Sequence, residues 1–237
     1  MTTEEVGAAE YQHVVIFLHG VGGSGSEWKR FLQKILPPRT KLILPSAPVA
    51  PVDLFFGREM SSWYNMYDSY TSNILEVKRM AELFHQLIQD EVDKGVRPEC
   101  IVLGGFSQGE WCVCLCVYLA SCDLSLHPAG GALALYVSLT AHLNLGGTFV
   151  LSSYLLAPWE LQDKSITRNN SNSPILICHG LEDVKVPVPW ALHCHSLVST
   201  LNTKCKLKKY VGLGHDVNSA VQHDVQIFLT NILCQSP

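Results

Sequence analysis

The chain has few charged residues and only a small excess of acidic ones. Charged side chains make up 16% of the 237 residues, and the formal net charge at pH 7 is −4. Proteins that bind nucleic acid carry a basic patch or stripe that neutralises phosphates, so no nucleic-acid partner is expected. With 47% hydrophobic residues, the composition is typical of a globular protein and not of a disordered one.

Long apolar runs are also missing. No stretch approaches the roughly 18–20 apolar residues that a membrane-spanning helix needs. The polar, acidic segment from Met1 to Glu5 lacks the basic and apolar regions of a signal peptide. We therefore expect a cytoplasmic protein. Its length fits one domain with a sizeable core, and no linker or compositional break divides residues 1–237.

Cysteine is abundant, with nine residues, but a disulfide framework is not expected in an intracellular chain of this length. Four of the nine lie close together, at Cys112, Cys114, Cys116 and Cys122. The alternate spacing of the first three suits one face of a strand better than a closed tetrahedral zinc site. We interpret these side chains as small buried hydrophobes, and we expect no metal ion.

Short apolar runs alternate with segments of helical periodicity. Strands are predicted at 13–18, 41–44, 101–104, 148–151, 174–178 and 206–210, and helices at 27–35, 74–94, 190–201 and 217–233. Residues 45–57 are expected to form a long Pro-rich connection. The alternation predicts an α/β fold, with a mostly parallel central sheet and helices on both faces.

The strongest local motif is the run from Gly105 to Gly109, which follows a predicted strand and contains Ser107. In an α/β-hydrolase such a run forms the nucleophile elbow, a strained turn from strand to helix that exposes the serine. Glycines two residues before and after the serine let the backbone pass without a Cβ clash. An ordinary glycine turn would give the same pattern, but the preceding strand favours Ser107 as a nucleophile.

An acid and a base follow in the chain order of that fold. Asp183 lies just beyond a predicted strand and would hold the imidazole of the base in the correct tautomer, with Glu182 as the alternative. Asp183 could instead be a turn or N-cap residue. Among ten histidines, His215 is the candidate base, because it lies in a glycine-rich loop between the last strand and the last helix.

Two backbone amides are needed to stabilise the oxyanion that forms during acyl transfer. Gln108, directly after Ser107, is expected to supply one. Val21, in the glycine-rich loop after the first predicted strand, is expected to supply the other. That loop has no Gly-Lys-Ser/Thr ending and no full dinucleotide fingerprint, so we do not interpret it as a phosphate-binding loop.

Four separated motifs together resemble the acyl-protein thioesterase and lysophospholipase-like carboxylesterase family of α/β-hydrolases. They are residues 18–25, 105–109, 179–187 and 214–215. A fifth stretch, residues 45–64, is similar to the loop that lines the acyl site in that family. The resemblance covers nearly the whole chain, with departures at Asp53, where a threonine is common, and at Asn65, where an aspartate is usual.

The resemblance implies hydrolysis of the thioester that links a fatty acyl group to a protein cysteine, without a cofactor. S-acylated proteins or acyl esters would be the substrates, with transient contact to a membrane surface. Lysophospholipase or small-ester carboxylesterase activity is the alternative. Candidate substrate-binding residues are Met60, Ser62, Trp63 and Leu155, and the further apolar candidates are Leu54, Phe55, Phe56, Leu156 and Trp159. Core packing would account equally well for each of these residues taken singly.

The chain leaves the family pattern after Gly109, and the expected continuation appears at residues 130–136. Removal of residues 109–129 would join Gln108 to Gly130 and restore the pattern. The start of the segment can be encoded by a string containing GTGAGT, and its end by a pyrimidine-rich run closing in CAG. We hypothesise a translated intron, with a genuine insertion as the alternative.

The inserted segment leaves two outcomes open. Either residues 110–120 replace the helix after Ser107, or the helix that begins near residue 130 is retained. Glu110 would place a carboxylate near a site that must stabilise negative charge. The sequence is therefore compatible with a working serine hydrolase and with a catalytically impaired hydrolase-fold binding protein.

Overall fold

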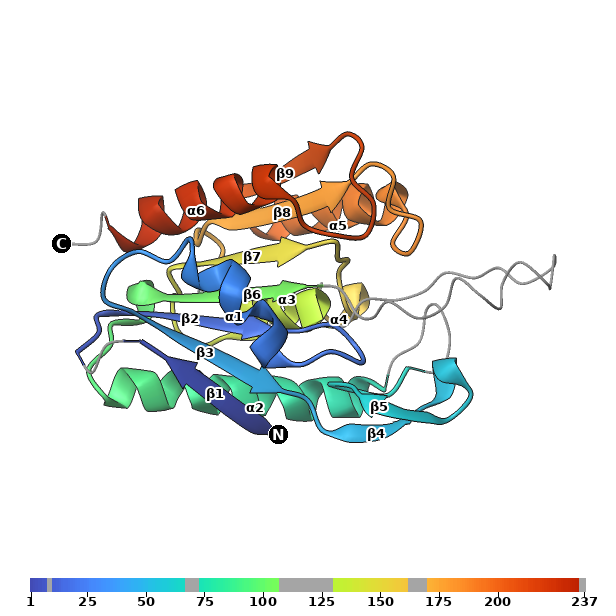
Figure 1. Ribbon diagram of the computed structural model, residues 1–237, viewed down its shortest axis with the longest axis horizontal. Coiled ribbons are helices and arrows are strands. Elements are labelled where there is room, and N and C mark those ends of the chain that lie inside the picture. Colours follow the sequence, from blue (N-terminus) through green and yellow to red (C-terminus); the bar gives the residue numbers. More distant parts are fainter. Residues whose placement is uncertain (8–9, 67–72, 107–129, 162–169, 235–237) are drawn as a thin grey trace.

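The computed structural model describes residues 1–7, 10–66, 73–106, 130–161 and 170–234. Its main feature is a seven-stranded sheet of order β1-β3-β2-β6-β7-β8-β9 (Figure 1). The strands are β1 (Thr2–Val6), β2 (His13–Leu18), β3 (Thr40–Ser46), β6 (Ile101–Phe106), β7 (Gly147–Leu151), β8 (Ile175–Gly180) and β9 (Cys205–Tyr210). Neighbouring strands are parallel except β1, which is antiparallel to β3. The predicted, mostly parallel sheet is confirmed.

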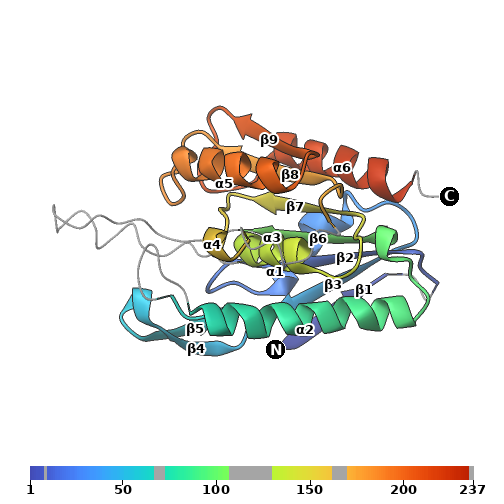
Figure 2. The same cartoon turned by 180° about the vertical axis from the view of Figure 1, so that it is seen from behind.

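Helices cover both faces of this sheet. One face carries α1 (Gly25–Gln33) and α6 (Ser219–Leu233). The opposite face carries α2 (Ile74–Asp93), α3 (Gly130–Thr140) and α5 (Val188–Leu201), as the view from behind shows (Figure 2). A short helix, α4 (Pro158–Leu161), follows β7. The four helices predicted from periodicity all form, with ends within two residues of the expected ones.

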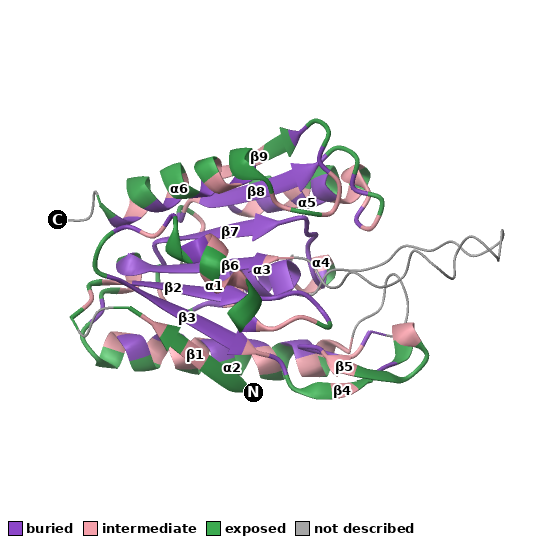
Figure 3. Cartoon of the chain, in the orientation of Figure 1, coloured by how far each residue is buried: buried purple, intermediate pink, exposed green. Residues whose placement is uncertain are grey.

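Successive residues along each central strand pack into two separate hydrophobic cores, one on each face of the sheet. In β2, Ile16 packs with the residues of α2, α3 and α5, whereas Val15 and Phe17 pack with those of α1 and α6. Side chains along a strand alternate between its two faces, so a sheet covered on both sides needs apolar residues at every position. The buried central strands in Figure 3 therefore explain the uninterrupted apolar runs of the sequence.

Helix α3 is apolar on every side and buried along residues 130–139. It packs against β6 and β7 and contacts α2. A helix without a polar face must lie inside a protein or a membrane. Within the described ranges no helix is long and apolar enough to cross a membrane. Of the two outcomes left open by the sequence, the helix that begins near residue 130 is present, while residues 107–129 lie outside the described part of the chain.

Two regions differ from the expected elements. Residues 45–57, expected as a long Pro-rich connection, contain the strand β4 (Val49–Val52). It forms a hairpin with β5 (Arg58–Ser61) through the 3-10 turn η1 (Asp53–Phe55), and this hairpin was not predicted. Pro51 is tolerated because a two-stranded ribbon has free edges that need no donor. Strand β1 was not predicted, since its polar and exposed residues lack the apolar pattern of a core strand.

A buried carboxylate ties the β1 and β3 edge to α2. Glu91 accepts hydrogen bonds from Lys41 Nζ at 2.9 Å, Lys94 Nζ at 2.8 Å and the Tyr11 hydroxyl at 2.8 Å. Lys41 also pairs with Glu5 at 2.9 Å. Burial acts to raise the pKa of Glu91, but the hydrogen bonds from Lys94, Lys41 and Tyr11 outweigh it and hold that pKa below its ordinary value.

We predict that Glu91→Gln lowers the free energy of unfolding at pH 7 by about 3 kcal/mol, because it leaves the buried Lys41 ammonium without its main counter-ion. The pKa of Glu91 is lowered by folding, so its contribution is complete above the ordinary carboxyl pKa and is lost as pH falls through the folded value. The free energies of unfolding of the two proteins, measured in urea, should therefore converge only at pH values below the ordinary carboxyl pKa. Glu82→Gln, an exposed change on the same helix, is the control and should not alter stability. Equal stability of the Glu91 variant and the parent at pH 7 would contradict the role of the cluster.

Candidate active site

Two predicted site residues meet at the carboxyl edge of the parallel strands. Asp183 follows β8, and His215 lies in the loop between β9 and α6. The Nδ1 nitrogen of His215 donates to Oδ2 of Asp183 at 2.8 Å. Because the ends of parallel strands share one edge of a sheet, motifs far apart in sequence are brought into direct contact.

The Asp183 carboxylate is buried and fully engaged. Its Oδ1 accepts from the backbone amides of Lys185 at 2.9 Å and Val186 at 2.8 Å. Burial acts to raise the pKa of Asp183, but the hydrogen bond and charge of His215, followed by the Val186 amide, outweigh it, so the pKa lies below its ordinary value. The rival acid, Glu182, is exposed, and its amide donates to Leu213. The contacts therefore favour Asp183 as the orienting acid.

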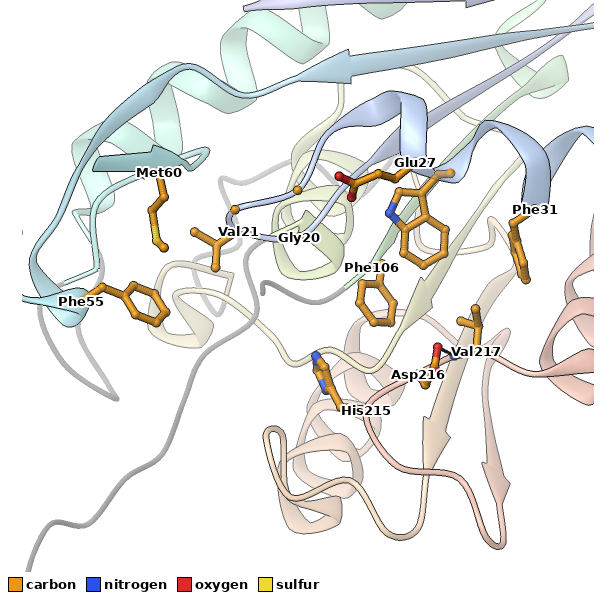
Figure 4. Close-up of a pocket in the computed structure, with 13 residues that line it drawn as sticks. Gly20, Val21, Glu27, Phe31, Phe55, Met60, Phe106, His215, Asp216 and Val217 are labelled. Carbon is orange, nitrogen blue, oxygen red and sulfur yellow. Dashed lines mark hydrogen bonds between the residues drawn. The ribbon is translucent and has the colours of Figure 1, made fainter. Parts of the chain in front are cut away.

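The other ring nitrogen of His215 is available for proton transfer. Its Nε2 atom is buried and has no hydrogen-bond partner among the described residues. The imidazole lies beside the ring of Phe106, the last residue of β6, with centroids 5.3 Å apart (Figure 4). Ser107 and Gln108 follow directly in the chain but lie outside the described residues. The Nε2 nitrogen, unpaired among the described residues, therefore lies beside the end of the strand that leads to Ser107.

The glycine-rich loop after β2 borders the same cavity. Val21 is buried, and no described residue accepts a hydrogen bond from its amide. Both following residues are held in place, since the Gly22 amide donates to Ser61 at 2.8 Å and the Gly23 amide to Gly20 at 3.1 Å. Gly22 has φ +75°, a conformation that favours glycine. The fixed loop leaves the Val21 amide as the candidate donor for an oxyanion.

His19 positions this loop, a role that the sequence analysis did not assign. Its Nδ1–H donates to the Gly20 carbonyl at 2.5 Å, and its Nε2 accepts from the Ala47 amide at 2.9 Å. The indole N–H of Trp63 donates to the His19 carbonyl at 2.8 Å. Burial lowers the pKa of His19, which keeps the ring in the neutral form that these two bonds require. The available signal was a histidine directly before a glycine at the end of a buried strand.

A cavity of about 430 Å³ opens beside His215. Its lining residues are Gly20, Val21, Gly22, Gly23, Glu27, Trp28, Phe31, Phe55, Met60, Phe106, His215, Asp216 and Val217. Figure 4 shows Phe55 and Met60 on one side of Val21, and Phe106 and Phe31 on the other. The ring of Trp28 packs against that of Phe106, with centroids 4.7 Å apart. Met60 and Phe55 were predicted to line the acyl site, whereas the aromatic face of α1 was missed. Its signal was the spacing of Trp28 and Phe31 on an amphipathic helix.

The other predicted substrate-binding residues make different contacts. Ser62 is buried, and its hydroxyl donates to the Tyr64 carbonyl at 2.8 Å. Trp63 is 2% exposed and stacks on His19, with ring centroids 4.9 Å apart. Leu155 is buried in the core that contains α2, α3 and α5. These three residues therefore support the site through contacts within the protein and are not among the residues that line the cavity.

The two residues that depart from the loop pattern of the family, Asp53 and Asn65, contact each other. The side-chain N–H of Asn65 donates to Oδ2 of Asp53 at 2.9 Å, and the Asp53 amide donates to Oδ1 of Asn65 at 3.0 Å. Asp53 begins the 3-10 turn that carries Phe55 to the cavity. The two hydrogen bonds fasten the turn to the segment that follows Trp63.

Within the described ranges, no three His, Cys, Asp or Glu side chains gather in a way that could hold a metal ion. Cys112, Cys114, Cys116 and Cys122 lie outside those ranges.

The sequence model of one family, Phospholipase/Carboxylesterase, matches residues 3–122 and 128–233. The chain belongs to this family. Its mostly parallel sheet with helices on both faces is that of the α/β-hydrolase fold, and membership of this phospholipase/carboxylesterase family makes the chain a hydrolase.

Similar proteins agree with this assignment. Acyl-protein thioesterase 1 of Gibberella zeae is 32% identical over 235 residues, covering 94% of this chain and 91% of the relative. Acyl-protein thioesterase 1 of Kluyveromyces lactis is 27% identical over 233 residues, covering 94% of this chain and 92% of the relative. The structure of Zea mays acyl-protein thioesterase 2 superposes with a TM-score of 0.80 at 23% identity, over 98% of this chain and 99% of that one. The structure of Arabidopsis thaliana SOBER1 superposes with a TM-score of 0.78 at 23% identity, over 93% of this chain and 99% of that one.

We predict that Asn65→Asp lowers Tm by about 2–4 °C at pH 7, because two carboxylates would then face each other across the contact with Asp53. Asp53→Thr alone should lower Tm by about the same amount, whereas the double variant should have a Tm close to that of the parent. Thermal unfolding of the four proteins forms a double-mutant cycle, so each single variant controls for the other. Additive effects would show that the pair is not coupled.

Proposed function

We propose that this family member is a serine hydrolase that cleaves fatty-acyl thioesters from protein cysteines. Ser107 would be the nucleophile, His215 the general base and Asp183 the residue that orients the base. The observation that carries the proposal is the Asp183–His215 hydrogen bond of 2.8 Å, with the second ring nitrogen unpaired among the described residues beside Phe106. The peptide bond after Phe106 leads to Ser107.

In this mechanism Ser107 Oγ attacks the acyl carbon while His215 Nε2 takes its proton. The Asp183 carboxylate stabilises the imidazolium through Nδ1 and keeps its own charge. The amides of Val21 and Gln108 would donate to the oxyanion. The imidazolium then returns its proton to the departing cysteine sulfur. A water molecule, deprotonated by the same nitrogen, attacks the acyl-serine ester. The imidazolium then gives that proton to the departing Ser107 Oγ as the fatty acid is released.

An acyl chain is the substrate group that best suits the cavity. Most of its side chains are apolar, including Phe55, Met60 and Trp28, and its volume of about 430 Å³ is in the range of small-molecule sites. The relatives named acyl-protein thioesterase support S-acylated proteins as the natural substrates. A cytoplasmic location, one domain over residues 1–237 and transient contact with a membrane surface belong to the same proposal.

We expect a fluorophosphonate probe to label the full chain and not the Ser107→Ala variant, because the probe reacts only with an activated serine. Asp183→Asn should slow labelling by about 100-fold or more, since it supports the wrong imidazole tautomer. His223→Ala changes an exposed histidine of α6 and is the matched control. The control should label at the rate of the parent.

Two outcomes would contradict this assignment. Labelling that survives Ser107→Ala would place the reactive group elsewhere. A folded full chain that does not label at all would favour the alternative of a hydrolase-fold protein that binds acylated partners without cleaving them.

We expect Met60→Lys to raise KM for a decanoyl thioester at least tenfold and to change kcat/KM for an acetyl thioester by less than threefold. A charge on the cavity wall removes the favourable burial of methylene groups, each worth about 0.8 kcal/mol, but leaves the reacting atoms untouched. Val49→Lys lies on the same hairpin at an exposed position and is the control. Equal losses on both substrates would exclude this wall from acyl binding.

A preference of the parent protein for lysolipid or small esters over an S-acylated peptide would support the alternative activity.

A further inference from the structure

The described chain ends β6 at Phe106 and begins α3 at Gly130, and these two residues are in backbone contact. A Cβ atom added to Gly130 would lie 2.6 Å from the Phe106 carbonyl oxygen and 2.1 Å from that of His19. Real Cβ atoms essentially never approach other atoms below 3.0 Å. Only glycine therefore fits at residue 130, where the end of β6, the start of α3 and the end of β2 touch without side chains between them.

The preceding glycine meets the same helix. A Cβ atom added to Gly105 would lie 2.5 Å from the Gly130 carbonyl oxygen and 2.8 Å from the Gly131 Cα. Gly131 is packed as tightly, with an added Cβ atom 2.7 Å from the Ser153 Cβ. A nucleophile elbow needs this close approach between a glycine before the serine and a glycine after it. In the structure, Gly130 supplies the second glycine of that pair.

Two residues are enough to join Phe106 to Gly130. The 2.6 Å contact, with the intervening bond lengths, puts their Cα atoms no more than about 6.5 Å apart. The first and fourth residues of a β-turn are separated by less than about 7 Å. A connection of two residues is therefore long enough to lead from β6 into α3.

We infer that Gly130, and not Gly109, is the second elbow glycine, and that residues 109–129 are an insertion that the fold does not need. The sequence pattern joins Gln108 to Gly130, and Gly130 is the glycine that meets Gly105 and the Phe106 carbonyl in the structure. The family model matches as far as residue 122 and resumes at 128, so its interruption covers only part of this segment. The role given to Ser107 rests on the proposed function, whereas the folding claim does not.

The first test compares the full chain with a chain lacking residues 109–129. We expect the shortened chain to be soluble and to show the same α/β circular dichroism. Its Tm should be unchanged or a few degrees higher, because closing a shorter loop between β6 and α3 costs less conformational entropy. A shortened chain that aggregates or unfolds about 5 °C or more below the parent would overturn the inference.

The second test uses point variants of the full chain and does not depend on the deletion. Gly130→Ala should lower Tm by several degrees, since its methyl group would overlap the His19 and Phe106 carbonyls. Gly109→Ala should leave Tm within about 1 °C of the parent. The reverse ranking would assign the elbow to Gly109 and overturn the inference.

Fluorophosphonate labelling then separates the two proposals. A shortened chain that folds and labels at Ser107 supports both of them. A shortened chain that folds with the expected Tm but does not label leaves the inference standing and contradicts the serine mechanism.

Discussion

A single buried carboxylate determines the geometry of the site. Asp183 accepts hydrogen bonds from the Lys185 and Val186 amides and from the His215 ring, which come from two different loops. A buried charge without partners would cost several kcal/mol, so the loops after β8 and β9 must supply these donors. The imidazole is thereby held against the end of β6, although its own loop is rich in glycine.

The parts of this arrangement that were predicted from sequence follow strong local patterns. Strands β2 and β8 are buried on both faces, so they appear as uninterrupted apolar runs, and β2 was predicted with its observed ends. Asp183 was identified because it occurs just beyond such a strand, and His215 because it lies in the glycine-rich loop between the last strand and the last helix. The chain order of acid and base then assigned their roles before any distance was known.

The remaining parts depend on contacts that no local pattern encodes. Strand β1 forms only because β3 offers it an edge, and the hairpin of β4 and β5 forms despite Pro51. Trp63 was expected at the acyl site, yet its indole N–H needs an acceptor and finds the His19 carbonyl. Of the residues predicted to bind substrate, Met60 lines the cavity, whereas the contribution of α1 to its wall was found only in three dimensions.

Strand β1 has a consequence for how the protein behaves in concentrated solution. Without it, β3 would end the sheet, and β3 is buried along residues 40–45. An apolar strand with unpaired amides and carbonyls is a template for joining another molecule edge to edge. The covering strand carries Glu4, which pairs with Lys29 at 2.7 Å, and Glu5, which is half exposed. Its charged outer side opposes such pairing, so the first six residues protect the folded chain from self-association.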